Sequence, residues 1–510
     1  MKNEKFGLVI LLLVSLLLST YLCFKTYVIS QDGAFQFIPM AKVFASGSLK
    51  DAIGYGGQQP LYSFLIAFVS RWVSDFETAG KLVSCFFGIL IIFPVYFLGK
   101  NIFDQKIAFL SAFFLAIHPY LRRFSADVLK ESTFLFFLAT AIWFSWRTIQ
   151  SEKRYPYLFV PILSVLAYLV RPDGVEILLV VFFYLLFVKK FSVSKNKWIV
   201  ISLLLLSSAV LFFPYLLHLR ELTGEWTLSR FKSIRGFLGW GFMGENVSLS
   251  YRMLYSLKEL NREMLLIYHY LYLFLLAIGL FKSISSGFKS GEKFLMSFFI
   301  LHYVVLFLLI LNLTPWSREG TGQIDYFSGR HVLPLLLFSI YWVGKGALAT
   351  YNWVYEKMES KRILFRLKPE RKSKVVWAAL LILVLAIVLP KTLKPQRYER
   401  LSEKWAGTWI KNRYGEGITI FTTMPRVAYY ADGTYERIDL EKDKFDEIKA
   451  SMAEKGALYL AIRPREIVDF PERAEAIKRN FIEVLRYEGK GMEEIVVYEK
   501  VNPVRRPLAF

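Results

Sequence analysis

The chain has 510 residues, of which 55% are hydrophobic and 17% aromatic. This composition is too apolar for a soluble domain that covers its core with polar side chains, so we expect a membrane protein. The formal net charge of +22 does not indicate a nucleic-acid partner, because the basic residues lie in short clusters between apolar runs and no reader motif accompanies them.

The apolar runs predict about eleven membrane-spanning helices, since a bilayer core needs roughly 20 apolar residues per helix. The predicted spans are 6–24, 79–99, 107–119, 129–149, 157–171, 175–189, 198–217, 264–281, 294–312, 331–347 and 375–390. Lysine and arginine concentrate in alternate loops, which the positive-inside rule assigns to the cytoplasm: 99–106, 146–156, 188–197, 281–293 and 357–374. We therefore expect the other loops outside the cytoplasm: 25–78, 118–128, 171–174, 218–263, 313–330 and everything after Pro390.

The first outer loop, 25–78, carries one acid directly after the first span, Asp32 in "SQDGAF". Apolar residues at helical spacing over 31–46 and 59–74 predict two amphipathic helices on the membrane surface. Asp32 has two interpretations from the residues alone. It is either a structural residue, as a solvated loop acid or as the N-cap of a helix over 33–46, or a general base that removes a proton from an acceptor.

Two further outer segments combine arginine with acids. "HPYLRRFSADVLKEST", which begins at His118, places Arg123, Asp127 and Glu131 four residues apart, so that they share one face of a helix. These residues form either an ion-pair ladder or part of a site. In "VRPDG", at 170–174, Arg171 either pairs with Asp173 in a tight turn or clamps a phosphate.

The last outer loop before the soluble part is "WSREGTGQIDYFSGRHVLP", at 316–334. Arg330 and His331 stand at the start of the tenth predicted span. A cation at this position either snorkels to the membrane interface or faces an anionic group of a lipid.

The composition after Pro390 is that of a soluble domain, so we divide the chain into a membrane domain, 1–390, and an extracytoplasmic domain, 391–510. The predicted strands are 418–423, 457–462 and 493–500, and the predicted helices are 399–413, 440–455 and 471–480. This pattern indicates a small α/β domain. It contains no glycine-rich phosphate loop, which favours an accessory role.

Several of these features together resemble a known family. An acid after the first span, surface helices, the turn before "PLYS", "HPYLRRFSADVLKEST" and "LVRPDG" are similar to the membrane glycosyltransferases of the GT-C fold. Within that fold the pattern most resembles glycosyltransferase family 39, the protein O-mannosyltransferase and lipid A aminoarabinose transferase type. Two positions depart from the family: Gly33 stands where a second acid is common, and Gln58, Gln59 and Pro60 replace a His-Pro-Pro.

The resemblance implies a polytopic α-helical membrane protein of the GT-C type with a small extracytoplasmic α/β domain. It also implies an inverting transferase in the cell membrane, the inner or plasma membrane. Such an enzyme moves a sugar from a polyprenyl phosphate, dolichyl or undecaprenyl, to a hydroxyl of a protein, lipid or glycan outside the cytoplasm.

The resemblance also assigns roles to individual residues. Asp32 is the expected general base, and one carboxylate suffices because a phosphate leaving group needs cations and hydrogen bonds rather than a second acid. The expected contacts to the donor are Arg123, Asp127, Arg171, Tyr326 and Arg330. The candidates for the acceptor or the wall of the cavity are Gln58, Gln59, Lys130 and His331.

Two other functions compete with transfer, and one class of cofactor stays open. A flippase for lipid-linked sugars would place ionisable groups near the bilayer midplane, whereas Lys81 and Glu176 both lie close to the ends of predicted spans. An oligosaccharyltransferase would carry a WWDYG-like motif after Pro390, which we do not find. The five histidines lack a two-histidine metal spacing, so we predict no cofactor and leave a divalent metal open.

Overall fold

The computed structural model describes residues 2–54, 59–150, 156–187, 197–229, 232–233, 247–314, 316–317, 320–321, 327–361, 368–440, 443–468 and 470–501. The chain divides into two compact units. The first contains Met1–Tyr21 and Val43–Lys394, and the second contains Leu22–Lys42 and Pro395–Phe510. Two predicted site residues, Gln58 and Tyr326, lie outside the described residues, as do most of the predicted loop 188–197 and parts of the loops 146–156 and 357–374.

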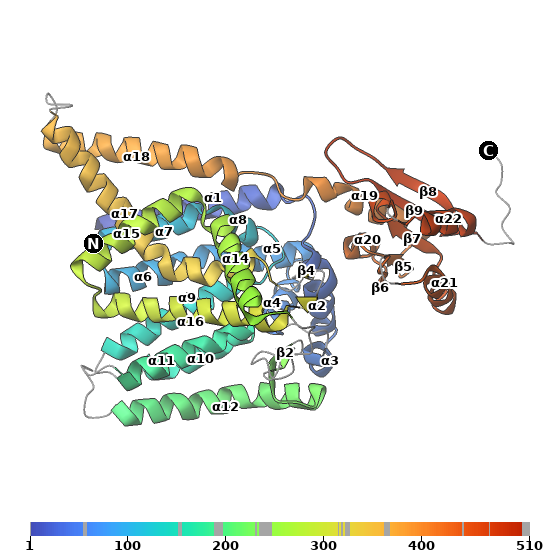
Figure 1. The fold of residues 1–510 in the computed structure, drawn as a ribbon, viewed down its shortest axis with the longest axis horizontal. Coiled ribbons are helices and arrows are strands. Elements are labelled where there is room, and N and C mark those ends of the chain that lie inside the picture. Colours follow the sequence, from blue (N-terminus) through green and yellow to red (C-terminus); the bar gives the residue numbers. More distant parts are fainter. Residues whose placement is uncertain are drawn as a thin grey trace. The chain divides into compact units, whose positions relative to one another are not determined.

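The first unit is built from helices, most of which run side by side (Figure 1). Helix α1 (Lys2–Phe24) begins in this unit and ends in the second. The other helices that belong to it wholly or in part are α2 (Ile38–Ala45), α3 (Leu49–Gly54), α4 (Leu61–Val69), α5 (Phe76–Leu90), α6 (Ile92–Ile102), α7 (Gln105–Ile117), α8 (Pro119–Ser125), α9 (Glu131–Gln150), α10 (Pro156–Tyr168), η2 (Pro172–Val175), α11 (Glu176–Phe187), α12 (Lys197–Thr223), α14 (Leu249–Tyr268), α15 (Tyr270–Ser286), α16 (Ser290–Leu313), η4 (Gly329–His331), α17 (Leu333–Ser360) and α18 (Pro369–Thr392). Two short hairpins, β1 (Thr227–Ser229) with β2 (Lys232–Ser233) and β3 (Trp316–Ser317) with β4 (Gly320–Thr321), complete it.

Six helices of the described residues are long and apolar enough to cross a membrane, or up to seven if a bent pair counts as one span. The predicted spans 107–119 and 157–171 fall on shorter apolar helices, α7 and α10. The predicted number of about eleven is therefore not confirmed, although a helix occupies each predicted position.

One predicted span, 264–281, is not a single helix. The chain bends by 104° between α14 and α15. The bend lies at His269, whose φ of 64° is in the left-handed region and cannot continue a right-handed helix. Apolar composition alone does not detect such a break, because residues on both sides of it remain apolar.

Helices α12 and α18 expose mainly apolar side chains, as the surface of a protein in a lipid bilayer does. Only 17% of the apolar window of α18 is buried inside the protein, and 28% of that of α12. Large apolar side chains on these helices are exposed, for example Leu206 at 65% and Ile382 at 68%. Such surfaces indicate contact with lipid, because water would make them unfavourable over this length.

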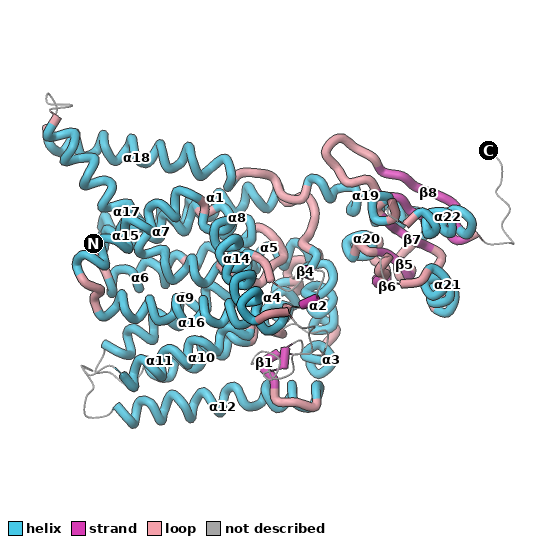
Figure 2. The backbone as a smooth tube through the Cα atoms, in the orientation of Figure 1, coloured by secondary structure: helices cyan, strands magenta, loops and turns pink. Residues whose placement is uncertain are grey.

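The second unit contains a five-stranded mixed sheet in the order β6-β5-β7-β9-β8 (Figure 2). Strand β5 pairs in parallel with β6 and β7, whereas β9 is antiparallel to β7 and β8. The strands are β5 (Thr419–Thr422), β6 (Thr434–Arg437), β7 (Tyr459–Ile462), β8 (Phe481–Tyr487) and β9 (Ile495–Lys500). Strands β5, β7 and β9 fall within the predicted strands, and β6 and β8 were not predicted.

Helices cover both faces of this sheet. On one face, Phe421 and Leu460 join a core with Ile448 and Met452 of α21 (Phe445–Glu454) and with Ile477 of α22 (Pro471–Asn480). On the other face, neighbouring strand residues such as Ile420 and Ala461 pack with residues of α19 (Leu401–Tyr414) and α20 (Pro425–Tyr430). Alternate strand residues therefore serve two cores, as the period of a strand requires. Helix α20 was not predicted.

Candidate active site

Asp32 immediately precedes a short π-helix, η1 (Gly33–Phe37), in the second unit. Its side chain is partly exposed. Its backbone is helical, with a φ of −62°, and its side chain makes no capping hydrogen bond, so the interpretation of Asp32 as an N-cap is wrong. Ser30 takes this role instead, because its Oγ accepts a hydrogen bond from the backbone N–H of Gly33 at 3.0 Å. The carboxylate is thus not used to close its own turn.

The close packing beneath Asp32 explains why residue 33 is glycine. A Cβ atom at this position would lie 2.7 Å from Oγ of Ser30 and 2.9 Å from Cγ1 of Ile29. Real Cβ contacts are not this short, so any side chain would displace one of these neighbours. The second acid that is common in the family therefore does not fit here.

In the first unit, Arg171 is nearly buried, with 4% of its surface exposed. Its Nη2 pairs with the carboxylate of Asp173, and its Nη1 donates to the backbone carbonyl of Arg330 at 3.2 Å. Its guanidinium also lies 4.9 Å from the ring centre of Phe134. The alternative in which Arg171 pairs with Asp173 is thus observed. The structure also brings two predicted site residues, Arg171 and Arg330, together.

The turn that carries Arg171 depends on Gly174. A Cβ atom at this position would lie 2.3 Å from the backbone nitrogen of Tyr168 at the end of α10. This close approach of the two backbones admits only glycine, and it places Arg171 beside the end of α10.

A buried histidine and carboxylate lie next to this turn. His302 of α16 is 1% exposed, and its Nδ1 lies 2.8 Å from Oε2 of Glu176, the first residue of α11. Its Nε2 lies 3.0 Å from the backbone oxygen of His331. A carbonyl oxygen only accepts, so Nε2 carries a proton and donates it. The ring of His331 stacks on Phe327 at 5.7 Å between ring centres.

The prediction that Arg123, Asp127 and Glu131 share a helix face is wrong. Helix α8 ends at Ser125 and α9 begins at Glu131, so a turn separates the residues. The side chain of Asp127 supports this turn, because its Oδ1 accepts from the backbone N–H of Val128 at 2.8 Å. Asp127 is buried, whereas Arg123 and Lys130 are partly exposed.

Asp127 and Glu131 nevertheless act on the same neighbour, the buried Tyr62 of α4. The hydroxyl of Tyr62 lies 2.7 Å from Oγ of Ser84, and that Oγ donates to the carbonyl of Leu129 at 2.9 Å. Burial first, and then the charges of Asp127 and Glu131, raise the pKa of Tyr62 well above its ordinary value. The "PLYS" motif thus contributes a neutral phenol that packs against the turn at 126–130.

Gln59 is a buried structural residue in the described part of the chain. It is 2% exposed, its Nε2 donates to the carbonyl of Leu228 at 3.1 Å, and its Oε1 accepts from the hydroxyl of Tyr215 at 2.8 Å. Tyr168 donates to the same carbonyl at 3.0 Å. The amide nitrogen and the amide oxygen of Gln59 thus connect residue 59 to β1 and to α12. These contacts do not support the prediction that Gln59 binds the acceptor of the sugar.

Comparisons with known proteins decide the fold. A family model described as dolichyl-phosphate-mannose-protein mannosyltransferase matches residues 57–218, and no protein of curated function matches the chain. Three of the similar solved structures are each 12% identical to this chain. ArnT from Cupriavidus metallidurans in the apo state has a TM-score of 0.63, and the match covers 99% of this chain and 100% of that chain. The apo oligosaccharyltransferase of Archaeoglobus fulgidus has a TM-score of 0.61 and coverages of 90% of this chain and 69% of that chain, and the mycobacterial arabinofuranosyltransferase AftD has a TM-score of 0.54 and coverages of 97% and 40%. The chain has the GT-C fold of membrane glycosyltransferases.

Within this GT-C fold, the sequence assigned no role to three buried polar residues: His302, its partner Glu176, and Arg122. Arg122 is 1% exposed, and its guanidinium donates to the carbonyl of Gly88 at 2.6 Å and to Oγ of Ser19 at 3.2 Å. The signal that could have found His302 is an ionisable residue in the middle of an apolar helix, which needs a partner. The contacts of His302 with Glu176 and with the backbone of His331 join three separate segments of the chain, so residue spacing does not reveal them.

Two other features of this GT-C chain bear on cofactors and ligands. Among the residues that the structure describes, no three or more His, Cys, Asp or Glu side chains gather closely enough to hold a metal ion. A large groove of about 1520 Å³ runs between α1, α7, α15, α17 and α18. It is lined almost wholly by apolar side chains and by none of the predicted site residues, so we do not assign the chemistry to it.

Proposed function

We propose that this protein is an inverting glycosyltransferase that moves a sugar from a polyprenyl phosphate to a hydroxyl acceptor outside the cytoplasm. The observation that carries the proposal is the GT-C fold with a partly exposed carboxylate, Asp32, shortly after the first span. The similar ArnT structure is described as bound to undecaprenyl phosphate, and the similar archaeal oligosaccharyltransferase as in complex with dolichol-phosphate and an inhibitory peptide. Both ligands are polyprenyl-type lipid phosphates, which supports a lipid-linked donor here.

In this proposal Asp32 accepts the proton of the acceptor hydroxyl as its oxygen attacks the anomeric carbon. The bond between that carbon and the phosphate oxygen breaks, and the lipid phosphate leaves with the negative charge. Arg330, held next to Arg171 by the hydrogen bond to its carbonyl, is the proposed cation for the phosphate. Arg171 pairs with Asp173 in the same cluster.

The proposal places the protein in the cell membrane, with the C-terminal residues outside the cytoplasm. The alternation of basic loops supports this orientation. It puts Asp32, Arg171 and Arg330 on the same side of the membrane, where a lipid-linked sugar meets its acceptor.

Replacement of the proposed base tests the function. We expect Asp32→Asn to reduce sugar transfer by a factor of at least about 100, because removal of a positioned general base typically costs about 100- to 10,000-fold. The measurement is the release of polyprenyl phosphate from undecaprenyl- and dolichyl-linked sugars by purified protein, in the presence of membrane and cell-surface extracts as acceptors.

Asp51→Asn is the matched control, since Asp51 is an exposed acid of the same outer loop that bonds to Ser48. A variant Asp32→Asn that inserts normally and keeps more than a few per cent of the wild-type rate would refute the assignment. A flippase, the alternative function, would leave the glycosidic bond intact in wild type and in both variants.

A further inference from the structure

The C-terminal domain holds the segment that leads to Asp32. Residues 25–28 follow α1 and pair with residues just after α18: Thr26 forms a parallel bridge with Gln396, and the backbone N–H of Gln396 donates to the carbonyl of Lys25 at 2.9 Å. The guanidinium of Arg397 donates to the carbonyl of Val28 at 3.1 Å. All of these residues belong to the second unit.

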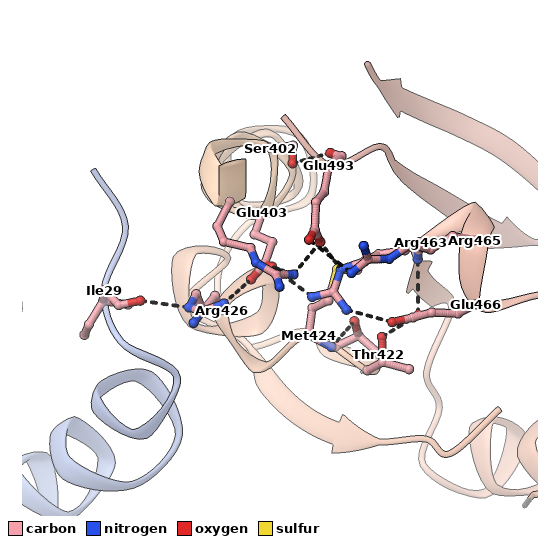
Figure 3. Close-up of polar contacts among 12 residues, drawn as sticks. Ile29, Ser402, Glu403, Thr422, Met424, Arg426, Arg463, Arg465, Glu466 and Glu493 are labelled. Carbon is pink, nitrogen blue, oxygen red and sulfur yellow. Dashed lines mark hydrogen bonds and ion pairs between the residues drawn. The ribbon is translucent and has the colours of Figure 1, made fainter. Parts of the chain in front are cut away.

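The next residue, Ile29, has both of its backbone polar groups bound by one helix of the domain. Its N–H donates to the hydroxyl of Tyr430 at 2.9 Å, and its carbonyl accepts from Nε of Arg426 at 2.8 Å. Arg426 and Tyr430 are four residues apart on α20, so they present both groups from one face of this helix. Figure 3 shows Arg426 reaching from the domain to Ile29.

A buried network fixes Arg426. Its Nη1 binds Oε2 of Glu403 at 3.0 Å, and Glu403 is completely buried. The other oxygen of Glu403 accepts from Arg463 at 2.9 Å and from Arg400 at 3.2 Å (Figure 3). Burial opposes ionisation of Glu403, but Arg426 and Arg463 outweigh it and hold the pKa of this carboxyl below its ordinary value.

The same network continues to the edge of the domain. Glu493 forms an ion pair with Arg463, whose Nε lies 2.8 Å from Oε2, and accepts a hydrogen bond from Arg465 at 3.0 Å, while Glu466 binds Arg463 at 2.7 Å (Figure 3). Each arginine therefore has a carboxylate partner and a defined geometry. The guanidinium of Arg426 has little freedom to rotate away from Ile29.

The position of Ile29 in turn determines that of Asp32. Ser30 closes the first turn by accepting the N–H of Gly33 on its Oγ and the N–H of Ala34 on its carbonyl, each at 3.0 Å. Gly33 has no room for a Cβ atom because Ile29 and Ser30 lie directly against it. The turn that contains Asp32 therefore cannot shift without moving Ile29.

We propose that Arg426 and Tyr430 are positioning residues for Asp32, so that the C-terminal domain is part of the catalytic apparatus instead of an accessory. This inference rests on the proposed function of Asp32 as the base. A base must lie within hydrogen-bond reach of its proton, and a displacement of about 1 Å can cost about 100-fold in rate.

Two mild variants test the inference. Tyr430→Phe keeps the ring and removes the hydroxyl that binds the N–H of Ile29. Arg426→Lys keeps a cation beside Glu403 but lacks the second nitrogen needed to reach Ile29 at the same time. The control is Arg486→Gln, which removes an exposed arginine of the same domain that binds Glu483 and Glu494.

The readouts are the steady-state kinetics of transfer and hydrogen exchange in peptides that cover 25–37. We expect kcat to fall by about 10-fold in each variant with the KM for the donor unchanged, since a misplaced base affects only the chemical step. We also expect faster exchange over 25–37 in both variants, and in the control neither change.

Unchanged exchange in Tyr430→Phe and Arg426→Lys would overturn the inference, and so would faster exchange with wild-type kcat. The exchange measurement does not depend on activity. If Asp32→Asn retained transfer, the proposed function of Asp32 would fail, while the exchange data would still report whether the domain holds the segment.

Discussion

At the scale of single residues, the packing of the segment around Asp32 requires that residue 33 has no Cβ atom. Gly33 is the first residue of the π-helix η1 and is not among the glycines with a positive φ, so its role is not to permit a left-handed backbone. It is required because Ile29 and Ser30 occupy the space of a Cβ atom. The second acid that the family commonly carries is thus excluded by packing, and the single carboxylate of Asp32 remains for the proposed proton transfer.

We predict that Gly33→Ala impairs both stability and transfer. The added carbon must push Oγ of Ser30 out of its hydrogen bond, and overpacking of this kind typically costs about 1–3 kcal/mol. The measurement is thermal unfolding together with the rate of transfer, with Gln31→Ala as a control because Gln31 is an exposed neighbour. Wild-type values for both properties in Gly33→Ala would show that the turn adapts freely.

At the scale of elements, buried polar contacts connect α16, the start of α11 and the turn η4. His302 of α16 contacts Glu176 at the start of α11 and the backbone of His331 in η4. Arg171, just before η2, contacts the backbone of Arg330 in the same η4 turn. Together the two contacts fix the turn that carries Arg330, the proposed cation for the donor phosphate.

We predict that His302→Ala destabilises the membrane unit far more than Glu176→Gln. Removing one partner of a buried pair leaves an uncompensated group, which costs about 3–5 kcal/mol, whereas glutamine can keep a hydrogen bond to the imidazole. Thermal unfolding in detergent measures the difference. Equal, small effects of the two substitutions would show that the pair does not stabilise the turn.

At the scale of the whole molecule, the two compact units do not follow the order of the chain. Residues 22–42 leave the first span and belong to the same unit as residues 395–510, although more than 350 residues separate them. Contacts with α20, with residues 396–397 and with Asp432, which pairs with Lys42 at 3.0 Å, account for this assignment. The proposed orientation in the membrane must place both segments on one side.

We predict that a reporter fused after residue 360 is cytoplasmic and one fused after residue 450 is extracytoplasmic. Helix α18 lies between the two positions and is apolar and long enough to cross the membrane. The basic loop 357–374 retains the first position inside. Reporters with the opposite readings would place Asp32 and the donor loops on the wrong side for the proposed reaction.

The sequence by itself determined the class of the protein, because membrane solvation requires long apolar helices and basic loops on one side, and both are visible as composition. It also located the strands β5, β7 and β9, whose signals are local, whereas the role of Asp32 stays a prediction. The face shared by Arg123, Asp127 and Glu131 was wrong because Asp127 supports a turn instead of continuing a helix. Only the tertiary structure decided the break at His269, the pairing of His302 with Glu176, and the attachment of Ile29 to α20. The pairing and the attachment depend on contacts between residues far apart in the chain, and neither periodicity nor charge at one position identifies a distant partner. The break at His269 depends on a left-handed backbone that apolar composition does not reveal.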